Sequence, residues 1–81
     1  MTEIENQLWI VSYEDGTTEW YIVDVYDGIY NFTEFDDGKY GSSITVKTLE
    51  EAIIEFKAEH KFVNSVTVYS KKLQYTWGEK S

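Results

Sequence analysis

The carboxylates are the side chains of this 81-residue chain whose types and spacing offer the most chemistry. Glu51, Glu55 and Glu59 follow one another at intervals of four residues, which places them along one face of a helix. No glutamate from Glu50 to Glu59 has a lysine three or four residues later in the segment, so it lacks ion pairs worth about 0.2–0.5 kcal/mol each. Two explanations remain open, a solvated face that aids solubility and a contact surface for a basic partner.

Residue types found in active sites and metal sites form no diagnostic pattern here. His60 is the only histidine, and at the end of an acidic helix its simplest role is a charge that favours the helix dipole. The acid pairs at 14–15 and 36–37 each precede a glycine, so turn formation explains them, and no segment has the oxygen spacing of an EF-hand. The chain has no cysteine, no phosphate-binding glycine loop and no GxSxG motif. We therefore expect no enzyme activity, no metal and no cofactor.

Charge is distributed unevenly along the chain, whose formal net charge is −8. The first 38 residues contain ten acids and no Lys or Arg, whereas the remaining 43 contain five acids and seven lysines. Nucleic-acid binders need cationic groups to displace phosphate counterions, and arginine, which reads bases most often, is absent. Direct binding to DNA or RNA is therefore disfavoured, while a basic protein surface would be attracted.

The elements that must position these residues are mostly strands. Three Asp-Gly pairs, at 15–16, 27–28 and 37–38, separate strand-like runs, and this dipeptide is the strongest short hairpin signal. They predict four antiparallel strands, at residues 7–13, 18–26, 29–35 and 39–46. Two further strands, at 66–69 and 73–77, are predicted near the end of the chain.

Residues 48–61 form the only segment with a helical period. Apolar side chains recur in it at i, i+3, i+4 and i+7: Leu49, Ala52, Ile53 and Phe56. Thr48 and Glu51 have the spacing of a capping box at the start of a helix. After the helix, Phe62 and Val63 are expected to tuck under the sheet.

The fold class predicted from this order is α+β, an antiparallel β-meander with one helix packed on it in the order β-β-β-β-α-β-β. Residues 1–81 form a single small domain, with loose ends at about 1–5 and 78–81. No run approaches the roughly 18 apolar residues of a membrane span, and the acidic N-terminus lacks the layout of a secretory signal. We therefore expect a cytoplasmic protein, located in the host cell if a phage encodes it.

Two-residue turns would fix the face of the sheet on which each side chain lies. They predict one wholly apolar face for the helix, with Leu8, Ile10, Tyr21, Val23, Val25, Tyr30 and Phe32. They place on the other face, toward solvent or a partner, Trp9, Val11, Tyr13, Trp20, Ile22, Phe35, Asp24, Asn31 and Thr33. A bulge in any turn would exchange these sets.

The function predicted from this surface is that of a small acidic protein–protein interaction module. It would inhibit a nucleic-acid-handling protein by occupying its basic groove, with carboxylates in place of phosphates, as phage anti-defence and toxin-immunity proteins do. The residues predicted to contact the partner are Glu51, Glu55, Glu59, Asp24, Asp36, Asp37, Trp9, Trp20 and Tyr13. Two alternatives remain open: a carbohydrate or small-molecule binder using Trp9, Trp20 and Tyr13, and a homodimer formed through the aromatic face or a strand edge.

Overall fold

The computed structural model describes residues 4–36, 38 and 40–78, and these form one antiparallel sheet and one helix. The sheet has the strand order β4-β3-β2-β1-β5-β6, which confirms the predicted α+β meander. The elements in chain order are β1 (Glu5–Tyr13), β2 (Thr18–Tyr26), β3 (Ile29–Glu34), β4 (Tyr40–Thr45), α1 (Leu49–Glu59), β5 (Val63–Tyr69) and β6 (Gln74–Gly78). The predicted loose ends fall largely on residues 1–3 and 79–81, which lie outside the described residues.

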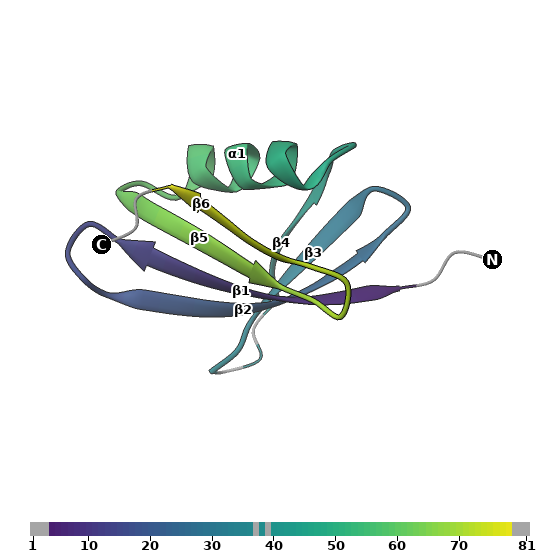
Figure 1. Ribbon diagram of the computed structural model, residues 1–81, viewed down its shortest axis with the longest axis horizontal. Coiled ribbons are helices and arrows are strands. Elements are labelled where there is room, and N and C mark those ends of the chain that lie inside the picture. The colour runs from purple at the N-terminus through teal and green to yellow at the C-terminus, as the bar shows by residue number, and fades with distance from the viewer. Residues whose placement is uncertain (1–3, 37, 39, 79–81) are drawn as a thin grey trace.

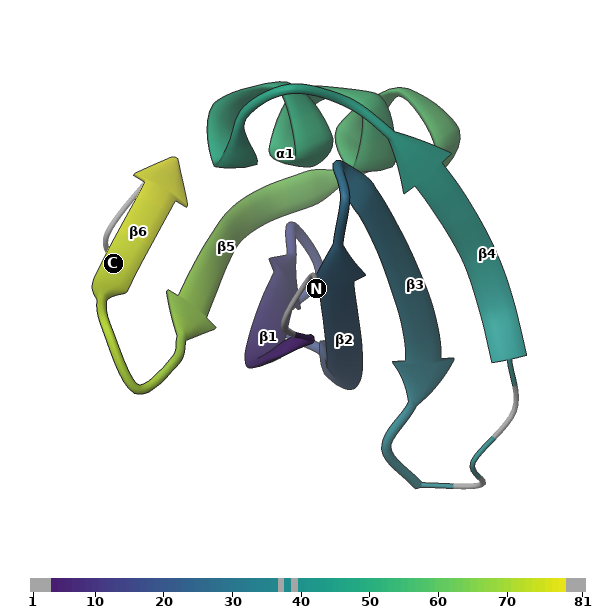
Figure 2. The same cartoon turned by 90° about the vertical axis from the view of Figure 1, so that its right-hand side faces the viewer.

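The helix lies on one face of the sheet only (Figure 1). Viewed along the long axis of the molecule, the sheet is curved, with β1 and β2 in the middle and the edge strands β6 and β4 rising toward α1 (Figure 2). We call the face that carries α1 the helix side and the opposite face the open face. The helix side encloses the hydrophobic core, and no described residue forms a second layer over the open face.

Aromatic rings fill the core between the sheet and α1. Trp9 is 0% exposed, and its ring meets Phe32 at 4.8 Å and Phe56 at 5.7 Å between centroids, both edge to face. Its indole Nε1 donates a hydrogen bond of 2.8 Å to Oε1 of the buried Gln7. Tryptophan nitrogens usually find such a partner when they are buried. The remaining buried apolar residues are Val11, Tyr21, Val23, Tyr30, Ile44, Ala52, Ile53, Val63, Val66 and Val68.

The turn between β1 and β2 contains three residues, not the predicted two. The Gly16 amide donates to the Tyr13 carbonyl at 3.0 Å, and the Tyr13 amide donates to the Thr17 carbonyl at 2.9 Å. Gly16 has φ +90°, so the turn has the hydrogen bonds of a type I turn followed by a left-handed residue. The extra residue shifts β1 by one position relative to β2 and so exchanges its two faces.

The predicted faces of β1 are therefore wrong, whereas those of β2 and β3 are confirmed. Trp9, Val11 and Tyr13 lie on the helix side. Trp9 is opposite Tyr21 and Val11 is opposite Glu19 on β2. The Tyr13 amide donates to the Thr17 carbonyl. Leu8 and Ile10 lie instead on the open face, opposite Ile22 and Trp20. On β2 and β3, the buried set Tyr21, Val23, Tyr30 and Phe32 is the one expected for the helix side.

The turn between β2 and β3 has the predicted two residues, Asp27 and Gly28, between the paired Tyr26 and Ile29. Both turn residues have positive φ, 54° and 76°, as a type I′ hairpin requires. A Cβ atom on Gly28 would also lie 2.8 Å from the Val46 carbonyl oxygen, so the position has no room for a side chain.

The helix begins as predicted and ends two residues earlier. Thr48 is the N-cap, and its Oγ1 accepts a hydrogen bond of 3.1 Å from the Glu51 amide. The Glu51 carboxylate in turn accepts a hydrogen bond of 3.2 Å from the amide of Lys47, the residue before the N-cap. Ala52, Ile53 and Phe56 are buried, which confirms the apolar stripe. The described part of the chain contains no helix long and apolar enough to cross a membrane.

The link from α1 to β5 differs from expectation at one residue. Val63 is buried, as predicted, but Phe62 is 69% exposed and does not tuck under the sheet. Phe62 has φ +67°, a left-handed conformation that is unusual for a bulky side chain. This conformation turns the chain into β5. It directs the Phe62 side chain to solvent and the next side chain, Val63, to the core.

Candidate functional site

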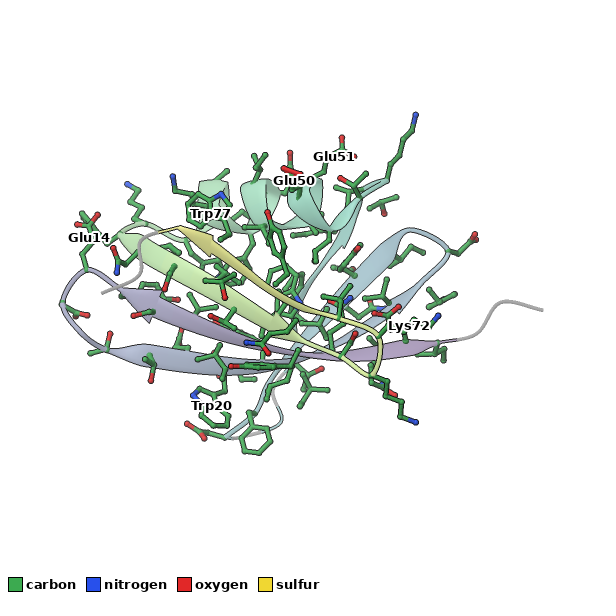
Figure 3. The ribbon with its side chains drawn as sticks, viewed as in Figure 1. Glu14, Trp20, Glu50, Glu51, Lys72 and Trp77 are labelled. Atoms are coloured by element: carbon green, nitrogen blue, oxygen red, sulfur yellow. The ribbon has the colours of Figure 1, made fainter. Side chains whose placement is uncertain are left out.

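The residues predicted to contact a partner lie on two opposite sides of the molecule. Trp20 extends from the open face, while the helix glutamates lie above the other face (Figure 3). Asp24 lies on the open face, opposite Asn6 of β1, and the Asn6 Nδ2 donates a hydrogen bond to the Asp24 carboxylate. Asp36 follows β3 and lies beside Trp20. Asp37 lies outside the described residues. A single flat surface therefore cannot contact all of these acids at once.

Trp9 has no exposed surface, so its predicted place beside Trp20 is wrong. The physical reason is the three-residue turn, which carries Trp9 and Tyr13 to the helix side while Trp20 stays on the open face. The proposed ligand platform of Trp9, Trp20 and Tyr13 consequently does not exist as one surface.

The three helix glutamates are exposed but not equivalent. Glu51 serves the helix N-terminus, since its Oε1 accepts from the Lys47 amide and lies 3.4 Å from Thr48 Oγ1. Within the described chain, Glu55 and Glu59 have no ion pair and no side-chain hydrogen bond. Lys57 lies on the other flank of the helix, 4.7 Å from the centre of the Trp77 ring, and so does not neutralise them.

A groove at one end of the sheet brings acids and aromatic rings together. We call it the end groove; it has a volume of about 760 Å³. It lies where the β1–β2 turn meets the link from α1 to β5, at the end of the molecule where Figure 3 labels Glu14. A 2.8 Å hydrogen bond from the Glu14 amide to the Phe62 carbonyl joins these two segments. The residues that line the groove are Tyr13, Glu14, Asp15, Thr17, Thr18, Glu19, Lys61 and Phe62.

Two tyrosines hold Glu19 at the inner edge of the groove. Tyr13 donates to Glu19 Oε1 at 2.5 Å, and Tyr21 donates to the same oxygen at 3.0 Å. Phenols donate only while protonated, and here they remain so: burial and the Glu19 carboxylate raise the pKa of both Tyr13 and Tyr21 above the usual value of about 10. Oε2 of Glu19 makes no hydrogen bond to any described residue and is available to a ligand.

The outer rim of the groove is held by its own turn. Asp15 Oδ1 accepts hydrogen bonds from the Thr17 amide at 2.9 Å and from the Thr17 hydroxyl at 2.7 Å. These hydrogen bonds lower the pKa of Asp15, which keeps the carboxylate charged. Among the described residues that line the groove, Lys61 is the one lysine, beside the three acids Glu14, Asp15 and Glu19. The groove therefore carries excess negative charge beside the rings of Tyr13 and Phe62.

This combination of groups suits a cationic side chain. A guanidinium can bind a carboxylate through two parallel hydrogen bonds and stack on an aromatic ring at the same time. Phe62 provides such a ring at an exposed position, and its positive φ is a local backbone cost of order 1–3 kcal/mol. Strain and exposure of a large apolar side chain at one residue favour a role in contact with another molecule.

The three carboxylates of the groove are not placed to share a metal ion, and His60 does not line the groove. No cluster of metal-ligating side chains occurs among the described residues. The His60 ring stacks on Phe56 with centroids 4.0 Å apart, and its backbone amide caps the helix at the Phe56 carbonyl. His60 therefore lies at the edge of the core, against Phe56.

Of the residues that line the end groove, Tyr13 is among the contact residues predicted from the sequence, but Glu14, Glu19 and Phe62 are not. Glu14 was explained by turn formation alone, and Glu19 has no signal until the register of β1 places it beside Tyr13. The exposure of Phe62 follows from its backbone conformation, which propensity does not predict for an aromatic residue.

No family model, no curated protein and no solved structure matches this chain.

Proposed function

We propose that this protein is an acidic protein–protein interaction module that inhibits a nucleic-acid-handling protein by binding its basic groove. The observation that supports this best is the end groove, whose lining combines the acids Glu14, Asp15 and Glu19 with one lysine and the rings of Tyr13 and Phe62. In this proposal the protein acts in the cytoplasm, as phage anti-defence and toxin-immunity proteins do.

The carboxylates would take the place of phosphates. A surface that binds nucleic acid is lined with Lys and Arg side chains that pair with phosphates, and fixed carboxylates can pair with the same side chains. The helix extends the negative surface, because α1 ends next to the groove and carries the unpaired Glu55 and Glu59. Their spacing along α1 is about 6 Å, from four residues at a rise of about 1.5 Å each.

Tyr13 and Phe62 would supply the apolar part of the contact. Carboxylates mainly raise the association rate and orient the partner, whereas buried aromatic side chains provide most of the binding free energy at interfaces. Tyr13 is already fixed by its hydrogen bond to Glu19, so little conformational freedom is lost when a partner covers it.

The test compares two double variants with the same change in net charge. E14Q/E59Q removes two acids from the end groove and its flank; E50Q/D27N removes two exposed acids elsewhere, and Asn tolerates the left-handed backbone of Asp27. Each tagged variant and the wild type are used to capture partners from cells of the native host. We expect the wild type and E50Q/D27N to recover a basic nucleic-acid-binding protein, and E14Q/E59Q to recover much less.

Two properties of the recovered complex decide the mechanism. Affinity should fall as salt rises, because screened charges contribute less, and DNA or RNA bound by the partner should be displaced. Binding that is indifferent to salt, or equal losses in both double variants, would refute the use of this groove.

A further inference from the structure

The open face carries a continuous apolar stripe that no described segment covers. Across β1 and β2, Leu8 lies opposite Ile22 and Ile10 lies opposite Trp20, and on the other side of β1 Leu8 lies opposite Tyr69. Side chains paired in this way are neighbours on the sheet surface. Trp20 is 44% exposed, and its ring lies 5.8 Å from that of Phe35, which is 54% exposed. Leu8, Ile10 and Ile22 in the middle of the stripe are half-buried, while Trp20, Phe35 and Tyr69 toward its ends are exposed. Contiguous apolar surface that remains partly exposed is typical of interaction sites.

The two ends of the stripe have different chemistry. At one end a shallow hollow of about 300 Å³ is lined by Thr18, Trp20, Phe35 and Asp36, so it combines two rings with a carboxylate. At the other end, beside Tyr69 and the β5–β6 turn, a hollow of about 250 Å³ is lined by Ile4, Glu5, Asn6, Lys71 and Lys72. Figure 3 shows Trp20 below the sheet, left of its middle, and Lys72 to the right.

The two ends of the stripe are complementary to each other, so one end of one copy fits the other end of a second copy. In a two-fold dimer, each contact occurs twice, with the same patch on both copies. When two open faces meet about an axis that lies in the interface and crosses the middle of the stripe, the stripes run antiparallel. Lys71 and Lys72 of one copy then lie over Trp20 and Asp36 of the other, where a cation meets both a ring and a carboxylate.

Other occupants fit the two ends less well. A basic partner would meet the lysines at the β5–β6 turn, and an acidic partner would meet Asp36 and Asp24. Repulsion between two chains of net charge −8 acts mostly over distances that physiological salt screens.

We propose that two copies of this protein associate through their open faces, with Lys71 and Lys72 of each copy against Trp20, Phe35 and Asp36 of the other. Leu8, Ile10 and Ile22 form the apolar centre of the contact. Thr18 lines both the end groove and the hollow at Trp20, so the groove adjoins this interface at one residue. The acids Glu14 and Asp15 of the groove, and α1, lie outside the proposed contact.

Sedimentation equilibrium of the purified full chain, from micromolar to several hundred micromolar at physiological salt, measures the association. We expect a monomer–dimer equilibrium for the wild type. K72E places an acid against Asp36 in both symmetric contacts and should raise the dimer Kd by about tenfold or more. W20A should weaken the dimer at least as much, because it removes the largest ring of the stripe.

Two matched variants keep the proposal falsifiable. K47E makes the same change in net charge at an exposed lysine next to α1, and its dimer Kd should stay within about twofold of wild type. D36K added to K72E restores a pair of opposite charges and should recover the dimer, while far-ultraviolet circular dichroism confirms that each variant is folded. A monomer throughout the concentration range, equal effects of K47E and K72E, or failure of D36K to restore association would overturn the proposal.

Discussion

Replacing Trp9 by phenylalanine should destabilise this protein far more than replacing Trp20 by alanine, although the second change removes the larger group. Trp9 packs against Phe32 and Phe56 with no exposed surface, so W9F opens a cavity where the second indole ring was. It also leaves Oε1 of the buried Gln7 without its donor. An unsatisfied buried group costs about 1–3 kcal/mol, and with the cavity we expect a total of about 2–4 kcal/mol.

That loss is large on the scale of the whole domain. Folded proteins have about 0.05–0.15 kcal/mol of stability per residue, so a chain of this length has roughly 4–12 kcal/mol to lose. Trp20 is nearly half exposed, with Phe35 beside its ring and Ile10 opposite it on β1, and W20A should cost about 1 kcal/mol or less in the monomer.

Urea unfolding followed by far-ultraviolet circular dichroism measures both changes without relying on the tryptophan signal. The protein concentration should be low enough to keep the chain monomeric, so that loss of a dimer is not counted as loss of fold. Equal losses for the two variants, or a larger loss for W20A, would show that β1 has the register of a two-residue turn, and the placement of Tyr13 beside Glu19 would be refuted with it.

Two further predictions concern the ends of the sheet. The pKa values of Tyr13 and Tyr21 are raised in the folded state, so the unfolded chain releases these protons first and the free energy of unfolding should fall as pH rises above about 10. In a spectrophotometric titration, E19Q should make both phenols titrate at lower pH. An unchanged titration would contradict their contact with Glu19. G28A forces a side chain into a left-handed turn and against the Val46 carbonyl oxygen, so it should lower the free energy of unfolding in urea by about 1–3 kcal/mol. G16A should lower it less, because a Cβ atom there meets nothing within 4 Å. The reverse order would contradict the turn geometry.

The sequence predicts the elements of this fold well because their signals are local. The capping residues Thr48 and Glu51 and the stripe with Ile53 and Phe56 define the helix within four turns of chain. Asp27 and Gly28 both accept positive φ, so their two-residue turn and the faces of β2 and β3 follow from the sequence.

The faces of β1 do not follow, because Asp-Gly fits two different turns. Asp15 can be the second central residue of a type I turn with Gly16 after it, or the first residue of a two-residue turn, and both satisfy the backbone. Hydrophobicity does not decide between them, since Leu8 and Ile10 are as apolar as Trp9 and Val11. Packing of the large indole against Phe56 favours the observed register, and this contact between distant residues is not visible in a local pattern.

The two proposed surfaces make a stronger module together than either does alone. Antiparallel stacking of two open faces places the two end grooves at opposite ends of the dimer, because each groove lies at the β1–β2 end of its own copy. A dimer can then engage two cationic sites of one partner assembly, and the second contact forms at high effective concentration. K72E should therefore keep the affinity of a single groove while losing the gain from the second, whereas E14Q/E59Q should lose partner binding and keep the dimer. This separation of effects is possible because the acids of the groove and the lysines of the β5–β6 turn lie at opposite ends of the same sheet.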